Sequence, residues 1–282
     1  MADSDLLQNK IIGFIGGGNM AQAIGMGILK KGIIKPNNIW ISSRTEKTLS
    51  IWKNVGANTT FKNYEVVQKS DIILLCVKPQ LLNEALETSI PPSNCDQEKL
   101  FISVIVGVTL AALQAKLSKI VSKPRIVRSM PNTPLLVSEG ITVYCSSLTT
   151  ENDEAVMKLL FSSTGICEKI QESLMNSAGA LTGSGPAYGY MIVEALADGA
   201  VRRGIPRETA TKFAAQVLVG AGKMILQTEK HPGQLKDEVC SPNGSTIAGV
   251  HALESGAVRA SLMNAIAAAA SRSDELSSST QN

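Results

Sequence analysis

Three consecutive glycines near the start of the chain constrain the fold more than any other stretch. Residues 11–15, which precede them, are an apolar run whose length and β-branched content are typical of a buried parallel strand. The glycines at 16–18 follow, and residues 19–30 read as a helix. The chain therefore begins with a strand, a glycine turn and a helix, in that order.

This turn has the spacing G-x-G-x-x-A, with Gly16, Gly18 and Ala21 at the three fixed positions. Gly16 allows a tight turn, Gly18 lets the backbone approach a pyrophosphate, and the small Ala21 lets the helix pack close to the strand. Unpaired N–H groups and the positive end of the helix dipole would then face the phosphates. The motif has the context that it requires, so it predicts a dinucleotide-binding site. The alternative is an ordinary turn, which glycines also favour.

The end of the second predicted strand, residues 38–42, bears on which dinucleotide binds. Folds that bind NAD commonly place an acid here to hold the ribose 2′-hydroxyl, but this chain has no acid before Glu46. Ser43 offers a hydroxyl and Arg44 a planar charged fork, which suit a 2′-phosphate. The pattern favours NADPH and leaves NADH possible. The alternative is that Ser43 only caps the following helix.

Strands and helices keep alternating over the first 170 residues. Each predicted strand ends in a turn rich in Gly, Pro or Asn, which is typical of a doubly wound parallel sheet. Further strands are predicted at 57–61, 71–77, 101–106, 125–130, 141–145 and 165–170. We therefore expect an α/β fold in which residues 1–171 form an N-terminal Rossmann-type domain with a doubly wound parallel sheet.

The chain changes character at residue 172, after which β-branched runs disappear and alanine becomes frequent. Pro186 stands where a helix over 187–203 begins, a position that proline favours. This helix is apolar on most of its circumference, so it must be buried in a core or an interface. We expect residues 172–282 to form an all-α dimerisation domain in an intertwined dimer. Residues 277–282 are polar and are expected to be disordered.

A polar loop at residues 241–246 leads into a helix that starts at Ile247. Free N–H groups of Ser245, Thr246 and Ile247 would suit a carboxylate. The alternative is that Ser245 or Thr246 merely caps the helix. The residues of the loop leave both possibilities open.

Composition and charge exclude several classes of protein. The chain of 282 residues is 44% hydrophobic and 18% charged, which is typical of a globular protein, and its length favours two domains. A net charge of +3, without clustered basic and aromatic residues, argues against nucleic-acid binding. No apolar run reaches the roughly 18–20 residues that a membrane-spanning helix needs, so no membrane is expected.

Cysteine usage and the N-terminus bear on the compartment. The five cysteines are scattered, with no C-x-x-C, and predict reduced thiols. They are Cys76, Cys95, Cys145, Cys167 and Cys240. With only His231 and His251, no metal site is expected. The first residues carry two acids, Asp3 and Asp5, and show neither a signal peptide nor a transit peptide, so we expect a cytoplasmic protein.

Five motifs together resemble the pyrroline-5-carboxylate reductase family. They are F-I-G-G-G-N-M-A at 14–21, C-V-K-P at 76–79, R-S-M-P-N-T-P at 128–134, G-S-G-P-A-Y at 183–188 and H-P-G-Q-L-K-D-E-V-C-S-P-N-G-S-T-I at 231–247. The resemblance extends from about Lys10 to Leu276. It implies reduction of 1-pyrroline-5-carboxylate to L-proline with NADPH or NADH. It also implies a Rossmann domain followed by a helical domain that forms interlocked dimers, often assembled into decamers.

The resemblance implies roles for matching positions. For the cofactor these are Ile15, Gly16, Gly17, Gly18, Asn19 and Met20 at the pyrophosphate, Ser43 and Arg44 at the 2′-phosphate, Asn63 at the adenosine, and Cys76, Val77, Lys78, Pro79 and Gly107 towards the nicotinamide. For the substrate they are Glu229, Ser241, Gly244, Ser245 and Thr246, in a pocket completed across the dimer. Glu229 and Thr246 would be catalytic, facing the imine nitrogen. Glu238, Asn243 and Gly244 depart from the family pattern, which leaves the detail of the loop open.

Two other functions compete with this interpretation. A dehydrogenase of the β-hydroxyacid type also joins a Rossmann domain to a helical one and places a lysine on a core helix, for which Lys212 and Lys223 are candidates. A lysine on a helix surface is the commoner explanation. A regulatory protein that binds the cofactor without turnover would not need a carboxylate pocket, so the loop at 241–246 argues against it.

Overall fold

The structure is a computed structural model that describes residues 6–7, 9–91 and 98–279. The described chain divides into two compact units, one up to Gly183 together with the residues from Ala269, and the other Ser184–Ala268. The domain boundary expected at residues 171 and 172 remains a prediction.

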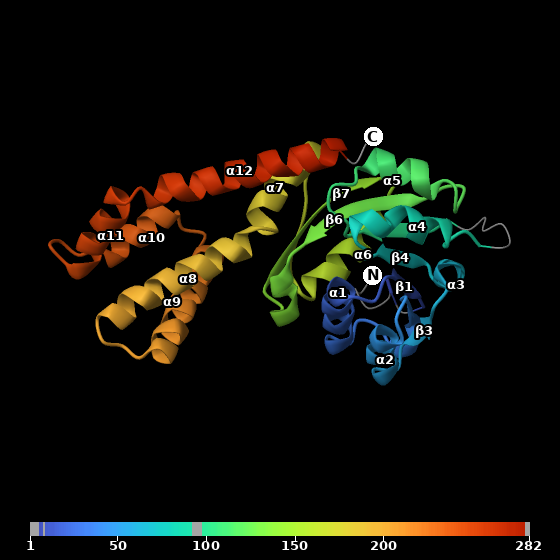
Figure 1. Cartoon of the computed structure of the whole chain (residues 1–282), viewed down its shortest axis with the longest axis horizontal. Helices are drawn as coiled ribbons and strands as arrows, with labels where there is room; N and C mark the ends of the chain where they lie inside the picture. Colours follow the sequence, from blue (N-terminus) through green and yellow to red (C-terminus); the bar gives the residue numbers. More distant parts are fainter. Residues whose placement is uncertain (1–5, 8, 92–97, 280–282) are drawn as a thin grey trace. The chain divides into compact units, whose positions relative to one another are not determined.

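The first unit is built on one eight-stranded sheet with the order β3-β2-β1-β4-β5-β6-β7-β8 (Figure 1). The strands are β1 Ile12–Ile15, β2 Ile39–Ser42, β3 Asn58–Thr60, β4 Ile72–Leu75, β5 Leu100–Ser103, β6 Arg125–Pro131, β7 Gly140–Ser147 and β8 Gly165–Lys169. The first six strands are parallel, and the order reverses next to β1, which lies between β2 and β4. The Rossmann-type doubly wound sheet is confirmed for these strands.

Two strands depart from the expected parallel sheet, because β7 runs antiparallel to β6 and β8 runs in the same direction as β7. Residues 132–139 between them contain only the short 3-10 turn η4, Thr133–Val137. A parallel crossover needs about a dozen residues or more, so this connection can only return the chain in the opposite direction. β8 then pairs parallel to β7 and extends the sheet to Lys169.

Helices cover both faces of this sheet, which explains why its central strands β1, β4 and β5 are buried along their whole length. The helices are α1 Asn19–Lys30, α2 Glu46–Asn54, α3 Asn63–Lys69, α4 Leu82–Glu87, α5 Leu110–Leu117, α6 Glu151–Ser162 and α7 Met175–Thr182. Short 3-10 turns are η2 Pro36–Asn38, η3 Pro79–Leu81 and η5 Glu172–Leu174. The core on one face contains side chains of α1, α2 and α6, and the core on the other face contains those of α3, α4 and α5.

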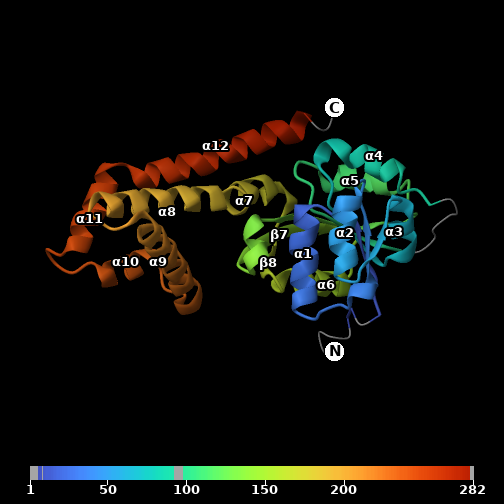
Figure 2. The ribbon, with the colours of Figure 1, turned by 60° about the horizontal axis from the view of Figure 1, so that its bottom comes forward.

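The second unit contains only helices in its described residues, as expected. They are α8 Gly185–Arg202, α9 Arg207–Thr228, α10 Pro232–Val239, α11 Ser245–Ser255 and the first part of α12 Val258–Ser279. Pro186 lies in the first turn of α8. α8 and α9 pack against each other (Figure 2) through small buried side chains, among them Ala197, Ala210 and Ala214.

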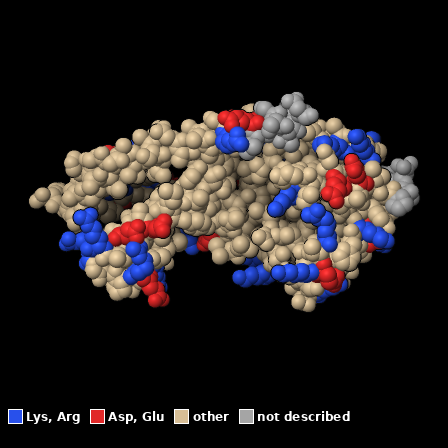
Figure 3. All heavy atoms as spheres, viewed as in Figure 1, with Lys and Arg blue, Asp and Glu red and all other residues tan. Residues whose placement is uncertain are grey.

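The helices of the second unit leave large apolar side chains exposed within the single chain. Among them are Met263 on α12 at 72% exposure and Met191 on α8 at 68%. Figure 3 shows few charged side chains along most of α12 in this view. This is the surface expected of helices that pack against another copy of the chain.

The described C-terminal residues are more ordered than expected. α12 continues to Ser279, so the disorder expected from residue 277 is wrong for 277–279, and residues 280–282 lie outside the described part. Four cysteines (76, 145, 167 and 240) are free, and Cys95 lies outside the described residues. The described helices include none long and apolar enough to cross a membrane. No cluster of three or more metal-binding side chains occurs among the residues described.

Candidate active site

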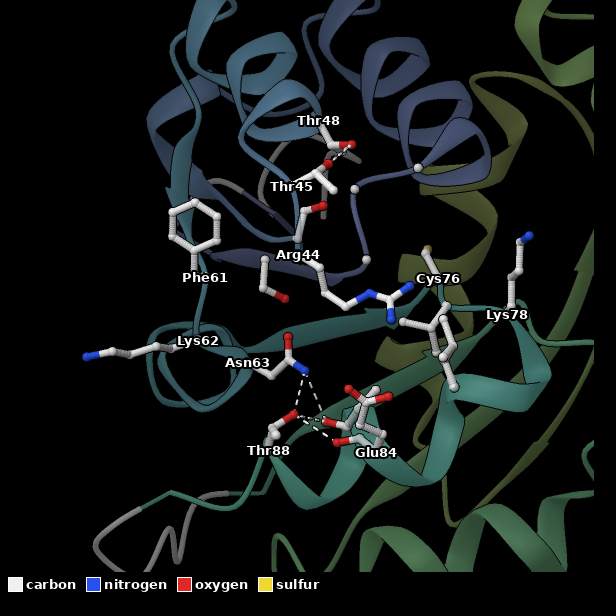
Figure 4. A pocket seen from close by; sticks show the side chains of 18 of the residues that line it. Arg44, Thr45, Thr48, Phe61, Lys62, Asn63, Cys76, Lys78, Glu84 and Thr88 are labelled. Atoms are coloured by element: carbon white, nitrogen blue, oxygen red, sulfur yellow. Dashed lines mark hydrogen bonds between the residues drawn. The ribbon is translucent and has the colours of Figure 1, made fainter.

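A cavity of about 1190 Å³ opens at the carboxyl ends of β1, β2 and β4 (Figure 4). Its walls are the glycine turn at 16–18, residues 42–45 after β2, residues 61–64 after β3, residues 76–78 after β4, and one face of α4. Open parallel sheets bind ligands where the strand order reverses, and β1 lies at that point. The cavity therefore lies where a dinucleotide is expected.

The glycine turn has the geometry that the motif predicts. Gly16 has a φ of +95°, and a Cβ there would lie 2.7 Å from the Cys76 carbonyl oxygen. A Cβ on Gly18 would meet no atom within 4 Å, so this glycine keeps the backbone open to a ligand. Ala21 is fully buried, as close packing of α1 on the sheet requires.

The first turn of α1 supplies unpaired donors to this part of the cavity. Gly18 is the N-cap residue, and no side chain caps the helix. The Gly17 carbonyl accepts hydrogen bonds from Trp52 Nε1 and from Gln22 Nε2, both at 3.1 Å. Because that carbonyl is bonded within the protein, the turn presents N–H groups to the cavity and suits an anion such as pyrophosphate.

The corner after β2 carries the groups expected to meet a 2′-phosphate. Arg44 is exposed and extends into the cavity (Figure 4). The helix α2 has Thr45 as its N-cap, so the alternative in which Ser43 caps it is wrong. Thr45 and Thr48 also line this corner, with their hydroxyl oxygens 2.9 Å apart. Hydroxyls, a guanidinium and an uncapped helix start thus converge here, and each favours a phosphate.

Asn63 presents only one side of its amide to the cavity. Its Nδ2 donates to the Ala85 carbonyl at 3.2 Å and to Thr88 Oγ1 at 2.8 Å. Figure 4 shows the amide nitrogen turned to Thr88 and the oxygen turned to the interior of the cavity. Asn63 therefore offers a hydrogen-bond acceptor, which suits a hydroxyl or an amino group and not a phosphate.

The wall that follows β4 is formed by Cys76, Val77 and Lys78. Burial raises the pKa of the Cys76 thiol well above its usual range. This thiol therefore stays neutral, and Cys76 and Val77 form an apolar wall beside the glycine turn. Lys78 points outward from the cavity in Figure 4.

Most of the predicted cofactor residues meet in this cavity. Those that line it are Gly16, Gly17, Gly18, Ser43, Arg44, Asn63, Cys76, Val77 and Lys78. Five lie outside its lining: Ile15 is buried in β1, Asn19 and Met20 begin α1, Pro79 begins η3, and Gly107 follows β5. The sequence reasoning missed Thr45, Thr48, Phe61, Lys62 and the face of α4. Phe61 and Lys62 directly follow β3, which was a usable signal.

In the second unit, residues 241–244 form a tight turn before α11, which begins at Ser245 and not at Ile247 as expected, so Ser245 and Thr246 lie in its first turn. The Gly244 N–H donates to the Ser241 carbonyl at 3.1 Å, and Asn243 has a φ of +57°. Gly244 is the N-cap of α11 and no side chain caps it, so the alternative in which Ser245 or Thr246 caps the helix is wrong. The first N–H groups of α11 and the two hydroxyls thus remain available for a carboxylate.

In the sequence, Glu229 precedes α10 and the loop at 241–246 follows it. It is the C-cap residue of α9 in a left-handed conformation, with a φ of +56°, and is exposed. Next to it, Lys230 Nζ lies 2.8 Å from Glu238 Oε1, and this bond lowers the pKa of Glu238. Lys212 and Lys223, the candidates for a dehydrogenase lysine, are both exposed on α9.

Comparison with known proteins identifies the family. A family profile described as pyrroline-5-carboxylate reductase dimerisation matches residues 172–276, and one described as NADP oxidoreductase coenzyme F420-dependent matches residues 11–107. The chain is 42% identical over 270 residues to pyrroline-5-carboxylate reductase from Arabidopsis thaliana, covering 95% of this chain and 96% of that protein.

Two solved structures show the same architecture. A pyrroline-5-carboxylate reductase from Coxiella burnetii superposes with a TM-score of 0.85 at 34% identity. A pyrroline carboxylate reductase from Plasmodium falciparum, with NADP bound, gives 0.81 at 33%. Each match covers 95% of this chain and 98% of the other. With the cavity, the uncapped loop and these relatives in agreement, the chain belongs to the pyrroline-5-carboxylate reductase family.

Proposed function

We propose that this chain carries out the reaction of its family, the reduction of 1-pyrroline-5-carboxylate to L-proline, with NADPH as the reductant. The observation that carries the proposal is the cavity at the strand-order reversal, with a basic and hydroxyl-lined corner at one end. The family assignment makes the chain an NAD(P)H-dependent oxidoreductase. The competing dehydrogenase and regulatory functions have no support from these relatives.

The first unit would bind and orient the cofactor. The uncapped start of α1 and the glycine turn would hold the pyrophosphate, and Ser43, Arg44, Thr45 and Thr48 would hold the 2′-phosphate. The Asn63 oxygen would accept a hydrogen bond from the adenosine. When bound, NADPH supplies a hydride from C4 of its nicotinamide to the imine carbon.

The second unit would hold the substrate. The first N–H groups of α11, with the hydroxyls of Ser245 and Ser241, would bind the carboxylate of the pyrroline ring and fix its orientation. Because a side chain at Gly244 would come within 2.3 Å of Ser241 Oγ, glycine keeps that hydroxyl and the turn in place.

The reaction needs one proton on the ring nitrogen in addition to the hydride. A protonated imine accepts hydride far better than a neutral one, so the site must stabilise a positive charge on nitrogen. The Glu229 carboxylate would supply the opposite charge, and the Thr246 hydroxyl would hydrogen-bond the nitrogen. Together these groups would hold the proton where the product amine needs it.

The finer aspects of assembly and location belong to this proposal as well. The exposed apolar side chains of α8 and α12 support an intertwined dimer, and we propose that such dimers assemble into a decamer. The four free cysteines support a reducing compartment such as the cytoplasm.

The proposal is tested by mixing purified protein with 1-pyrroline-5-carboxylate and NADPH, with NADH in parallel. We expect loss of the nicotinamide absorbance with proline as the product, and faster turnover with NADPH. A folded dimer that binds NADPH and oxidises neither cofactor would overturn the proposal.

A further inference from the structure

An ion pair between a buried arginine on β6 and a partly exposed glutamate on η5 lies outside the cavity and holds the chain that follows β5. Arg128 on β6 has a side chain that is only 4% exposed, and its Nη1 lies 3.1 Å from Glu172 Oε1. The same carboxylate oxygen accepts the backbone N–H of Leu110 at 2.7 Å. We propose that Glu172, held by Arg128, is a positioning residue that fixes the segment 104–109 for the nicotinamide; this inference rests on the proposed function.

The segment 104–109 connects β5 to α5 and is fixed at both ends. At its start, the Val104 N–H donates to the Leu75 carbonyl of β4 at 3.2 Å. At its end, Thr109 Oγ1 accepts the Ala112 N–H at 3.2 Å, and Glu172 accepts the Leu110 N–H. Glu172 thus places a carboxylate against the start of α5, where negative charge also suits the helix dipole.

Between these ends the segment turns towards solvent. Ile105 and Val108 are 3% and 4% exposed and anchor it in the core, whereas Val106 between them is 54% exposed. Gly107 turns the backbone with a φ of +82°. The exposed turn at Val106 and Gly107 therefore depends for its position on the buried Ile105 and Val108 and on the hydrogen bonds that hold the two ends of the segment.

The position of the segment relates it to the reacting end of the cofactor. It begins next to Leu75, the residue before the Cys76–Lys78 wall of the cavity. In folds with this strand order the adenosine lies over the β2 side and the second nucleotide lies over the β4–β5 side. The segment at 104–109 therefore borders the nicotinamide half, while the groups at β2 and β3 hold the other half.

A second partner also holds the buried arginine. A buried guanidinium needs hydrogen-bond acceptors, and Arg128 has two, because its Nη2 also donates to Asn176 Oδ1 at 3.2 Å. Asn176 in turn donates to Asp274 Oδ1 on α12 at 2.8 Å. These bonds connect α5, β6, η5, α7 and the end of α12 within the first unit.

The test uses Glu172→Ala and Glu172→Gln, with Arg125→Ala as the matched control. Gln keeps an acceptor for the Leu110 N–H. Three residues earlier on the same strand, Arg125 forms an ion pair with Asp153 at 2.8 Å, on α6 and not on η5 or α5. We expect Glu172→Ala to raise hydrogen–deuterium exchange in the 104–110 peptide of the cofactor-free protein. Glu172→Gln and Arg125→Ala should leave that exchange close to wild type.

The same variants separate positioning from a general loss of stability. For Glu172→Ala we expect kcat to fall about tenfold with the NADPH affinity within about threefold, since only the nicotinamide end loosens. The isotope effect with 4-deuterated NADPH should increase, and the fluorescence enhancement of bound NADPH should fall. Arg125→Ala should lower the melting temperature without changing the isotope effect.

Two results would overturn the inference. One is unchanged exchange in the 104–110 peptide of Glu172→Ala. The other is a parallel loss of kcat and melting temperature in Glu172→Ala and Arg125→Ala, which would assign Glu172 a structural role alone. A wild-type protein that does not reduce the imine would instead overturn the proposed function, while the exchange result would still decide whether Glu172 holds the segment.

Discussion

The two units of this chain differ in how much of their apolar surface they bury by themselves. The sheet of the first unit has a core on each face, filled by large side chains such as Trp52, Phe14 and Phe101. The cluster of buried residues in the second unit consists of alanines, and its large apolar side chains remain exposed. The first unit therefore completes its core alone, whereas the second needs other surface to cover it.

This difference indicates that cofactor binding does not depend on the dimer, whereas substrate binding does. The cavity for the cofactor is built from residues of one unit in one chain. The carboxylate loop is carried by helices whose apolar faces need a partner. We therefore expect cofactor binding to survive when the dimer is lost, and turnover to disappear.

The largest expected effect comes from breaking the dimer with Met263→Asp on α12. Burial of a methionine contributes about 1.5–3 kcal/mol, and a symmetric interface loses it twice while burying two charges. We expect a monomer in sedimentation velocity, no turnover, and nearly unchanged NADPH affinity. Val137→Asp in the first unit, where Val137 is equally exposed at 71%, is the control and should stay dimeric. A Met263→Asp protein that remains dimeric would contradict our inference that the apolar face of the second unit packs against another copy of the chain.

The next effect is confined to the loop of the second unit. Thr246→Ala removes the hydroxyl proposed to bind the imine nitrogen, so kcat/KM should fall about 100-fold. NADPH affinity, measured by fluorescence titration, should not change. Thr211→Ala is a suitable control, because the Thr211 hydroxyl only bonds the Arg207 carbonyl on α9. Turnover at the wild-type rate in Thr246→Ala would refute the assignment.

The cavity of the first unit is tested by Arg44→Ala. Loss of the guanidinium should raise KM for NADPH about tenfold and leave KM for NADH nearly unchanged, because only NADPH carries the 2′-phosphate. Lys47→Ala removes a nearby exposed charge outside the cavity lining and should change neither. Equal effects of Arg44→Ala on both cofactors would show that Arg44 does not contact the phosphate.

The smallest effect concerns the stability of the first unit. Burial favours a higher pKa for Glu154, but Lys169, Tyr144, Ser146 and Thr149 donate to it and lower its pKa to about 2. A carboxylate with a lowered pKa stabilises the fold above its ordinary pKa of 4.5 and loses this contribution as the pH falls towards 2.

Glu154→Gln should therefore lower the free energy of unfolding by about 1–2 kcal/mol at pH 7, and by less as the pH is lowered through that window. Urea denaturation at several pH values measures this difference. Glu168→Gln, on the strand β8 that follows α6, is the control. A destabilisation of Glu154→Gln that is the same at pH 3 and pH 7 would contradict the proposed ionic role, and turnover should remain at the wild-type level.

Local patterns in the sequence predicted the elements well. The turn after β1 follows from Gly16 and Gly18, because few other sequences place glycines between a strand and a helix in this way. The direction of β7 could have been predicted from the short connection at 132–139, which holds no crossover helix. The caps of α2 and α11 could not, since several Ser and Thr residues compete at each helix start.

Groups that meet only in the folded chain were beyond sequence reasoning. The face of α4 lines the cavity because of strand order, and a single sequence does not give that order. Arg128 and Glu172 are 44 residues apart and share no motif, so only the structure shows that they bond. Exposure of apolar side chains in the second unit was predictable, because alanine-rich helices without polar faces require a partner.

The neutral thiol of Cys76 has a consequence for chemical inhibition. Electrophilic compounds react with thiolates, and burial keeps the pKa of this thiol far above neutral pH. A covalent warhead directed at Cys76 would thus meet a neutral thiol, so compounds that approach this sulfur would need to bind reversibly.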